Sequence, residues 1–188
     1  MMDEDIRIFK SKQNIRRAFI ELLHEKSFNK ITIQDIVDKA LTGRSTFYNH
    51  YMDKYDLLEQ LVEQHTRAFR TLIEKRYQAT RPQEVRRLIE EILNSIVMHR
   101  DEIGTLLEVH LPNADLRKNM EDILYQSSLH YLSDTVKEPS VPLDYIASLY
   151  SANVITLISW TIKNGKNPDT IELADKLQSF VFGVVQQG

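Results

Sequence analysis

Cysteine is missing from this chain of 188 residues, and glycine and proline occur only five times each. The absence of cysteine excludes a disulfide scaffold, a cysteine-based zinc site, an iron–sulfur cluster and a thiol nucleophile. The scarcity of glycine and proline disfavours a sheet-rich fold, because the tight turns between strands require such residues. Since the segments between these breakers are long and 42% of the residues are apolar, the sequence predicts an all-α protein.

Signals for membrane insertion and export are also missing from the sequence. No run approaches the ~18 uninterrupted apolar residues of a membrane-spanning helix. The start of the chain, MMDEDIRIF, is acidic where a signal peptide is basic. We therefore expect a soluble protein of the cytoplasm.

Patterns typical of catalysis are absent as well. The six histidines are scattered along the chain, without the His-Glu-x-x-His spacing of a metalloprotease helix. The sequence has neither a glycine-rich phosphate loop nor a Gly-x-Ser-x-Gly nucleophile elbow. Acidic neighbours such as Glu90 and Glu91 fit a solvated helix surface. We therefore predict that the chain is not an enzyme and has no catalytic residues, no metal site and no cofactor.

The charges are distributed unevenly, although their formal sum is only −3. Residues 7–54 include ten basic and five acidic side chains, whereas residues 57–188 include 14 basic and 18 acidic ones. A basic N-terminal part followed by an acidic remainder predicts that the N-terminal part has a polyanionic partner.

Hydrophobic periodicity predicts about nine helices. In the N-terminal part, Ser11 is the expected N-cap of a first helix, and Thr32 is the expected N-cap of a second helix with Asp35 in the capping-box position. A short turn leads into a third helix over 44–51. Two short helices joined by such a turn form a helix-turn-helix.

The domain organisation follows from this pattern. We assign residues 1–53 to a helix-turn-helix domain and residues 54–188 to a helical domain for effector binding and dimerisation. In the second domain, the segment from Leu143 to Ile162 is apolar on nearly all sides, whereas a surface helix needs an apolar stripe only ~100° wide. The excess predicts a homodimer formed by the last two helices, and the alternative is a fully buried central helix.

A dense motif lies between Ile31 and Leu58. Its elements are Thr32-Ile33, Asp35-Ile36-Val37, Ala40, Thr46-Phe47-Tyr48, His50-Tyr51 and Lys54. These residues resemble the DNA-binding domain of the TetR family of transcriptional regulators, and the resemblance covers roughly residues 11–62. One turn departs from the family pattern, because Leu41-Thr42-Gly43 stands where the family has Gly-Val-Ser.

The end of the chain carries a second resemblance. Trp160, the pair Asn164-Gly165 and then Pro168 are similar to the ending found in a subgroup of the family that includes regulators of dihydroxyacetone-kinase operons. That subgroup includes an activator that docks a protein partner. The effector of this chain is therefore open between a small molecule and a protein, and the choice between activator and repressor is open too.

The third helix is expected to read DNA. Its exposed first turn carries Arg44, and an arginine side chain can bind O6 and N7 of one guanine together. The resemblance directs one group of residues toward bases, namely Arg44, Ser45 and Thr46. It directs a second group toward the phosphate backbone, namely Thr32, Tyr48, His50 and Lys54. Asn49 completes the predicted DNA-binding set, because it lies one turn after Ser45 on the same side of the helix.

The resemblance also implies a ligand pocket among the body helices. The polar-tipped residues that could line it are His65, Tyr125, His130, Asn153 and Trp160. The sequence therefore predicts a dimeric regulator on a palindromic double-stranded operator, whose DNA affinity is modulated through residues 54–188. The alternative is a protein-interaction module that has kept the helix-turn-helix scaffold and lost specific DNA binding.

Overall fold

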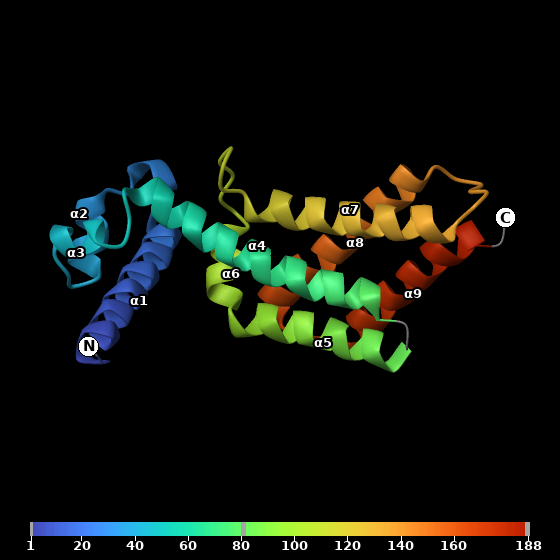
Figure 1. Ribbon diagram of the computed structural model, residues 1–188, viewed down its shortest axis with the longest axis horizontal. Coiled ribbons are helices and arrows are strands. Elements are labelled where there is room, and N and C mark those ends of the chain that lie inside the picture. Colours follow the sequence, from blue (N-terminus) through green and yellow to red (C-terminus); the bar gives the residue numbers. More distant parts are fainter. Residues whose placement is uncertain (1, 80–81, 187–188) are drawn as a thin grey trace. The chain divides into compact units, whose positions relative to one another are not determined.

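The computed structural model describes residues 2–79 and 82–186, with side chains described for 6–79, 84 and 87–177. Over these ranges the protein has nine α-helices and no strand, apart from an isolated bridge between Leu111 and Ala114 (Figure 1). The helices are α1 (Met2–Glu25), α2 (Ile33–Lys39), α3 (Arg44–Tyr48), α4 (Lys54–Gln78), α5 (Pro82–Met98), α6 (Arg100–Leu106), α7 (Leu116–Thr135), α8 (Leu143–Asn164) and α9 (Pro168–Gln186). The predicted all-α fold is confirmed.

The chain divides into two compact units. The first comprises the residues up to Gln64 together with the short segment Leu111–Ala114, and the second comprises the remaining residues. Helix α4 begins in the first unit and continues into the second. The functional division into residues 1–53 and 54–188 stays a prediction.

In the first unit, α1, α2 and α3 pack against one another. Phe19, Ile36 and Phe47 are fully buried between them. Helix α1 begins before the predicted position, because no proline or glycine interrupts residues 2–10. Ser11 therefore lies inside the helix, where its hydroxyl donates a hydrogen bond to the carbonyl oxygen of Ile8 at 2.9 Å. The prediction of Ser11 as the N-cap is wrong.

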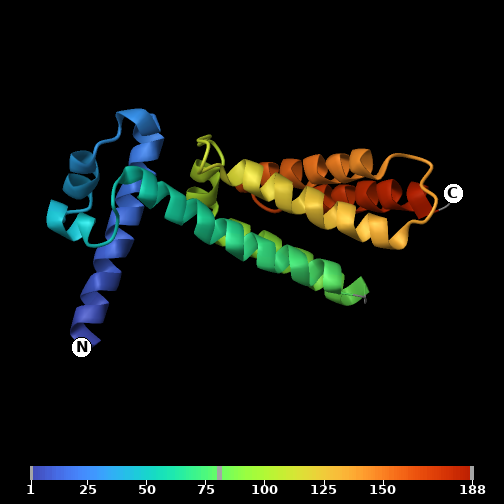
Figure 2. The same ribbon diagram turned by 45° about the horizontal axis from the view of Figure 1, so that its top comes forward.

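In the second unit, α7 and α8 lie side by side along their lengths in both views (Figures 1 and 2). Small buried side chains, Ser128 on α7 and Ser151 on α8, allow this close packing. The Ser151 hydroxyl also donates to the carbonyl oxygen of Glu121 at 3.0 Å. Helix α8 ends at Asn164, and its C-cap residue, Gly165, has a φ of 82°, in the region that favours glycine.

Helix α8 is the one helix among the described residues that is long and apolar enough to cross a membrane by length and composition. The core helix of a soluble protein meets the same criterion, and α8 contacts α5, α6, α7 and α9. Its place between these helices accounts for much of its apolar character. The helix is nevertheless not fully buried, because Tyr145, Leu149 and Trp160 are exposed.

Candidate nucleic-acid interface

The interface begins at the N-terminus of α2, where the predicted capping box is present. The Thr32 hydroxyl accepts a hydrogen bond from the backbone N–H of Asp35 at 3.1 Å, and the Thr32 backbone N–H donates to the Asp35 carboxylate at 2.8 Å. The Lys26 ammonium lies 2.8 Å from the same carboxylate. Lys26 and then Thr32 lower the pKa of Asp35 to about 2. The Asp35 carboxylate therefore stays ionised at neutral pH, and the capping box stabilises the start of α2.

The turn between α2 and α3 contains the departure from the family pattern at residue 41. Leu41 has a φ of 51°, the left-handed region that disfavours side chains with a Cβ atom. Its side chain is 94% exposed, so no packing compensates for this backbone conformation. The neighbouring Thr42 is half-buried, and Gly43 is the N-cap of α3 without a side-chain hydrogen bond. The turn therefore has the helix-turn-helix geometry although leucine occupies its left-handed position.

Helix α3 separates an inner side from an outer side. Phe47 is fully buried and packs against Tyr48 and Tyr51 at ring-centroid distances of 5.7 and 5.6 Å. The outer side carries the polar residues that were predicted to read DNA: Arg44, Ser45, Tyr48 and Asn49 are exposed, and Thr46 is half-buried. The helix ends at Tyr48, three residues before the predicted end.

A side-chain network orients Arg44. Its Nε donates a hydrogen bond to Oε1 of Gln34 at 2.8 Å, and Nε2 of Gln34 donates to the Asp38 carboxylate at 2.6 Å. Because Gln34 engages only Nε, both terminal nitrogens of the guanidinium remain for the two acceptors of a guanine. Gln34 was missed by the sequence analysis, because its contact with Arg44 depends on how α2 and α3 pack.

Lys54 is held more firmly than a solvated charge. Its ammonium donates to the carbonyl oxygens of Phe28, Asn29 and Ile31 at 2.9, 3.2 and 2.8 Å. It also lies 4.6 Å from the centre of the Phe28 ring. Burial lowers the pKa of Lys54. An ammonium has three donors, so a phosphate contact would require Lys54 to give up a carbonyl, and this contact stays a prediction.

His50 ties the end of α3 to α1. Its Nε2 lies 2.8 Å from the Ser11 hydroxyl. Burial, and then the positive charge of Lys12, lower the pKa of His50 below its usual value. The ring is therefore neutral at pH 7 and offers a phosphate a hydrogen bond without a charge. No local sequence pattern predicts the contact between His50 and Ser11, because the two residues are 39 positions apart.

The structure places the predicted pocket residues in several environments. Asn153 lines a cleft in the second unit, whereas His65, Tyr125, His130 and Trp160 do not. His65 is buried with its Nε2 2.8 Å from the Glu102 carboxylate, and His130 is exposed and pairs with Asp134 at 3.5 Å. The positions of these four residues along their helices place them on faces that do not line the cleft. The cleft is lined instead by residues that include Arg76 and Tyr77, which the sequence analysis missed.

Comparisons with known proteins agree with this geometry. Residues 15–61 match the model of the family described as bacterial regulatory proteins, tetR family. A TetR transcriptional regulator from Streptococcus agalactiae 2603V has a similar structure, with a TM-score of 0.64 and 27% identity over 94% of this chain and 98% of that chain. The chain is also 26% identical over 183 residues to YxbF, an uncharacterised helix-turn-helix-type transcriptional regulator of Bacillus subtilis strain 168. That match covers 94% of this chain and 46% of the relative, so the chain spans about half of the relative's length.

The expected subgroup appears among structures of the same fold. DhaS, a dihydroxyacetone kinase operon activator, has a TM-score of 0.52 and 17% identity over 94% of this chain and 97% of that chain. This likeness shows the fold alone. The relatives named here are regulators, which supports the expectation that the chain is not an enzyme.

The helix-turn-helix of α2 and α3, with its exposed polar side and its buried Phe47, has the geometry of the class of helical domains that read DNA. Residues 15–61 are similar to the tetR family of bacterial regulatory proteins, and the described helices have the fold of those regulators.

Proposed function

We propose that this protein is a transcriptional regulator that inserts α3 into the major groove of an operator. The observation that carries the proposal is the exposed guanidinium of Arg44, held through Nε by Gln34 with its two terminal nitrogens left for a base. Ser45 and Thr46 lie on the same short helix, Asn49 is its C-cap, and these three residues complete the proposed base-reading side. Such a protein acts where the chromosome is, in the bacterial cytoplasm.

The four residues proposed to contact phosphates differ in the hydrogen bonds that they already make within the protein. Tyr48 is 55% exposed, so its hydroxyl is accessible to a phosphate oxygen of the DNA. Thr32, His50 and Lys54 each already make hydrogen bonds within the first unit. We expect these three residues to position α2, α3 and the start of α4, and to contact phosphates only where the existing bonds rearrange.

The proposed assembly is a homodimer through α8 and α9. Tyr145, Leu149 and Trp160 are exposed along α8 at spacings of four and eleven residues, which place them on one face of the helix. On α9, Leu173 and Leu177 are exposed one turn apart. The later apolar residues of α9, namely Phe180, Val181, Val184 and Val185, lie outside the described side chains. To enter successive major grooves, the two copies of α3 in such a dimer must lie about 34–36 Å apart, one turn of DNA.

The dimer predicts a measurable oligomeric state. The wild-type protein should sediment as a dimer at micromolar concentration, and Leu149→Glu should shift it toward the 22.0 kDa monomer. Gln126→Glu on α7 is the matched control, because Gln126 is exposed and lies outside the proposed interface. A wild-type monomer at micromolar concentration would rule out the proposed dimer.

We further propose that a small ligand or a protein partner of the second unit modulates DNA binding. Helix α4 supports this, because it continues from the first unit into the second without a break. A typical coupling of this kind changes operator affinity by about 1–3 kcal/mol. Operator affinity that is identical with and without a demonstrated ligand of the body would contradict the coupling.

The test of DNA reading is selection of bound sequences from a random DNA pool, followed by affinity measurements at fixed salt. We expect enrichment of a two-fold symmetric sequence with a guanine in each half-site that depends on Arg44. Failure to enrich any sequence over a range of salt concentrations would contradict the proposal. That result would favour a protein-interaction module on the same scaffold.

A further inference from the structure

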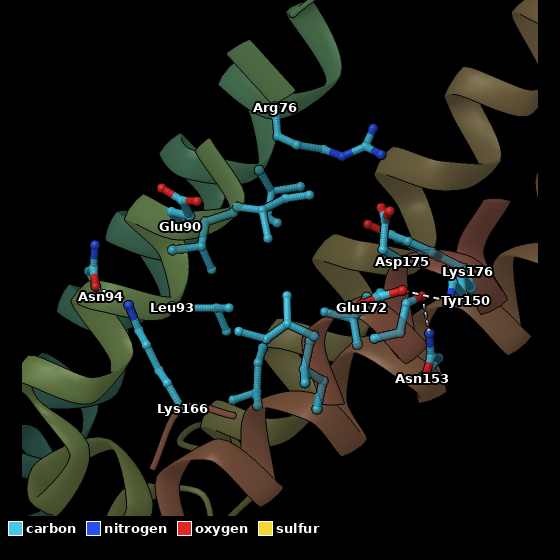
Figure 3. A pocket seen from close by; sticks show the side chains of 18 of the residues that line it. Arg76, Glu90, Leu93, Asn94, Tyr150, Asn153, Lys166, Glu172, Asp175 and Lys176 are labelled. Carbon is cyan, nitrogen blue, oxygen red and sulfur yellow. Dashed lines mark hydrogen bonds and ion pairs between the residues drawn. The ribbon is translucent and has the colours of Figure 1, made fainter. Parts of the chain in front are cut away.

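The second unit contains a cleft of about 1050 Å³, lined by residues of α4, α5, α7, α8 and α9 (Figure 3). This volume is slightly above the usual range of small-molecule sites, roughly 300–1,000 Å³. The inner wall is apolar, with Ile92, Leu93 and Ile158 all buried. A wall of this kind binds an apolar ligand body through the hydrophobic effect.

The charges at the outer edge of the cleft are solvated. The three acidic lining residues, Glu90, Glu172 and Asp175, are all exposed. Glu172 pairs with Lys176 at 2.6 Å, and Lys166 donates a hydrogen bond to Asn94. These groups therefore lie in water with partners of their own, and they contribute little to the recognition of a buried ligand head.

The polar groups away from the outer edge include Arg76 and Tyr77, which lie next to each other on α4. Arg76 is half-buried, its guanidinium carbon lies 4.5 Å from the centre of the Tyr77 ring, and it makes no ion pair with a described carboxylate. Figure 3 shows its side chain extending across the cleft from α4. Among the lining residues whose side chains the structure describes, Arg76 is the only half-buried charge, because the other five charged side chains are exposed.

The Tyr77 hydroxyl is a second polar group at the cleft, and it is buried. It is shielded from water and makes no hydrogen bond of normal geometry to the described residues, although Tyr150 and Ser128 lie close enough to affect its pKa. Burial raises this pKa, so the phenol stays protonated and remains a donor. A buried hydroxyl without a partner costs about 1–3 kcal/mol, and an acceptor group on a ligand would remove that cost.

We propose that this cleft binds an amphipathic anion, with its apolar chain on Ile92, Leu93 and Ile158 and its carboxylate between the Arg76 guanidinium and the Tyr77 hydroxyl. The proposal rests on the proposed function, because it names the chemical class of the small ligand that acts on the body. Arg76 and Tyr77 are adjacent on α4, and a carboxylate has the lone pairs to accept hydrogen bonds from both. A cationic head would instead meet the Arg76 charge at the inner end.

The test compares three probes with the same twelve-carbon tail: dodecanoate, dodecanol and dodecyltrimethylammonium. Their dissociation constants are measured by isothermal titration calorimetry below the concentrations at which they form micelles. We expect dodecanoate to bind at least tenfold more tightly than dodecanol, and dodecanol more tightly than the cation. Tightest binding of the cation, or no binding of any probe, would overturn the proposal.

Two variants locate the head group. Arg76→Gln should weaken dodecanoate about tenfold or more and change dodecanol less than threefold, and Tyr77→Phe should weaken dodecanoate roughly three- to tenfold. Arg70→Gln, an exposed arginine on the same helix that does not line the cleft, is the matched control and should change neither. Circular dichroism checks that each variant is folded. Equal losses for dodecanoate and dodecanol in Arg76→Gln would refute the assignment of the head.

Operator binding measured on the same protein separates this proposal from the proposed function. If the protein binds a selected operator but no dodecanoate, the ligand class is wrong and DNA reading stands. If it binds dodecanoate with the expected preference but selects no DNA, the ligand class stands and the proposed function is wrong.

Discussion

The hydrogen bond between Gln34 and Arg44 gives the sharpest test of how the protein reads DNA. Gln34→Ala removes the Oε1 acceptor 2.8 Å from Nε of Arg44. Because both side chains are exposed, the bond contributes little to folding, and its main effect is to orient the guanidinium. We expect Arg44→Ala to cost about 1–3 kcal/mol on the operator. A net hydrogen bond is worth about 0.5–1.5 kcal/mol, so Gln34→Ala should cost about 0.5–1 kcal/mol.

The decisive quantity is the coupling in a double-mutant cycle. If Gln34 acts only by positioning Arg44, the Gln34→Ala change should have almost no effect once Arg44 is alanine. Fluorescence anisotropy at fixed salt, on the selected operator and on random DNA, measures all four proteins. Gln60→Ala is the matched control, because Gln60 makes a similar exposed hydrogen bond, to Asp56 at 3.1 Å. Additive losses, or an equal loss on random DNA, would refute the positioning role.

Three further predictions concern the stability of the first unit. Lys54→Met should lower the free energy of unfolding in urea by about 1.5–3 kcal/mol, whereas Lys30→Met, which removes the same charge from an exposed site, should have little effect. An unchanged free energy of unfolding together with a smaller salt slope of operator binding would instead make Lys54 a phosphate contact. Leu41→Gly should raise the stability by roughly 0.5–1 kcal/mol, because glycine adopts a φ of 51° without strain, and Thr42→Gly next to it should lower it; a loss for Leu41→Gly would show that leucine is not strained there. Because the pKa of His50 is lowered in the folded state, protonation favours unfolding, so the melting temperature should fall as the pH drops below 6.5 and should not depend on His50 above that pH. The variant His50→Gln should reduce this fall, and His130→Gln is the exposed control. An unchanged pH profile of the melting temperature in His50→Gln would contradict the assignment.

Elements that depend on neighbours within one or two turns were predictable from the sequence. The capping box of Thr32 and Asp35 and the glycine that ends α8 follow from backbone geometry over a few residues. The same is true of the all-α class, which periodicity and the scarcity of glycine and proline indicate. The start of α1 was mispredicted at Ser11, because serine fits a helix N-cap and a hydroxyl bonded to its own helix equally well.

The arrangement of side chains from different helices was decided only by tertiary structure. Periodicity places Arg44 on an exposed face, but the contact with Gln34 depends on how α2 packs against α3. Lys54 reaches carbonyl oxygens more than twenty positions earlier in the chain. In the body, one predicted pocket residue, Asn153, lines the cleft, because the helix faces that meet there depend on the packing of five helices. A local pattern determines which side of a helix is apolar, and only packing determines which polar groups meet across helices.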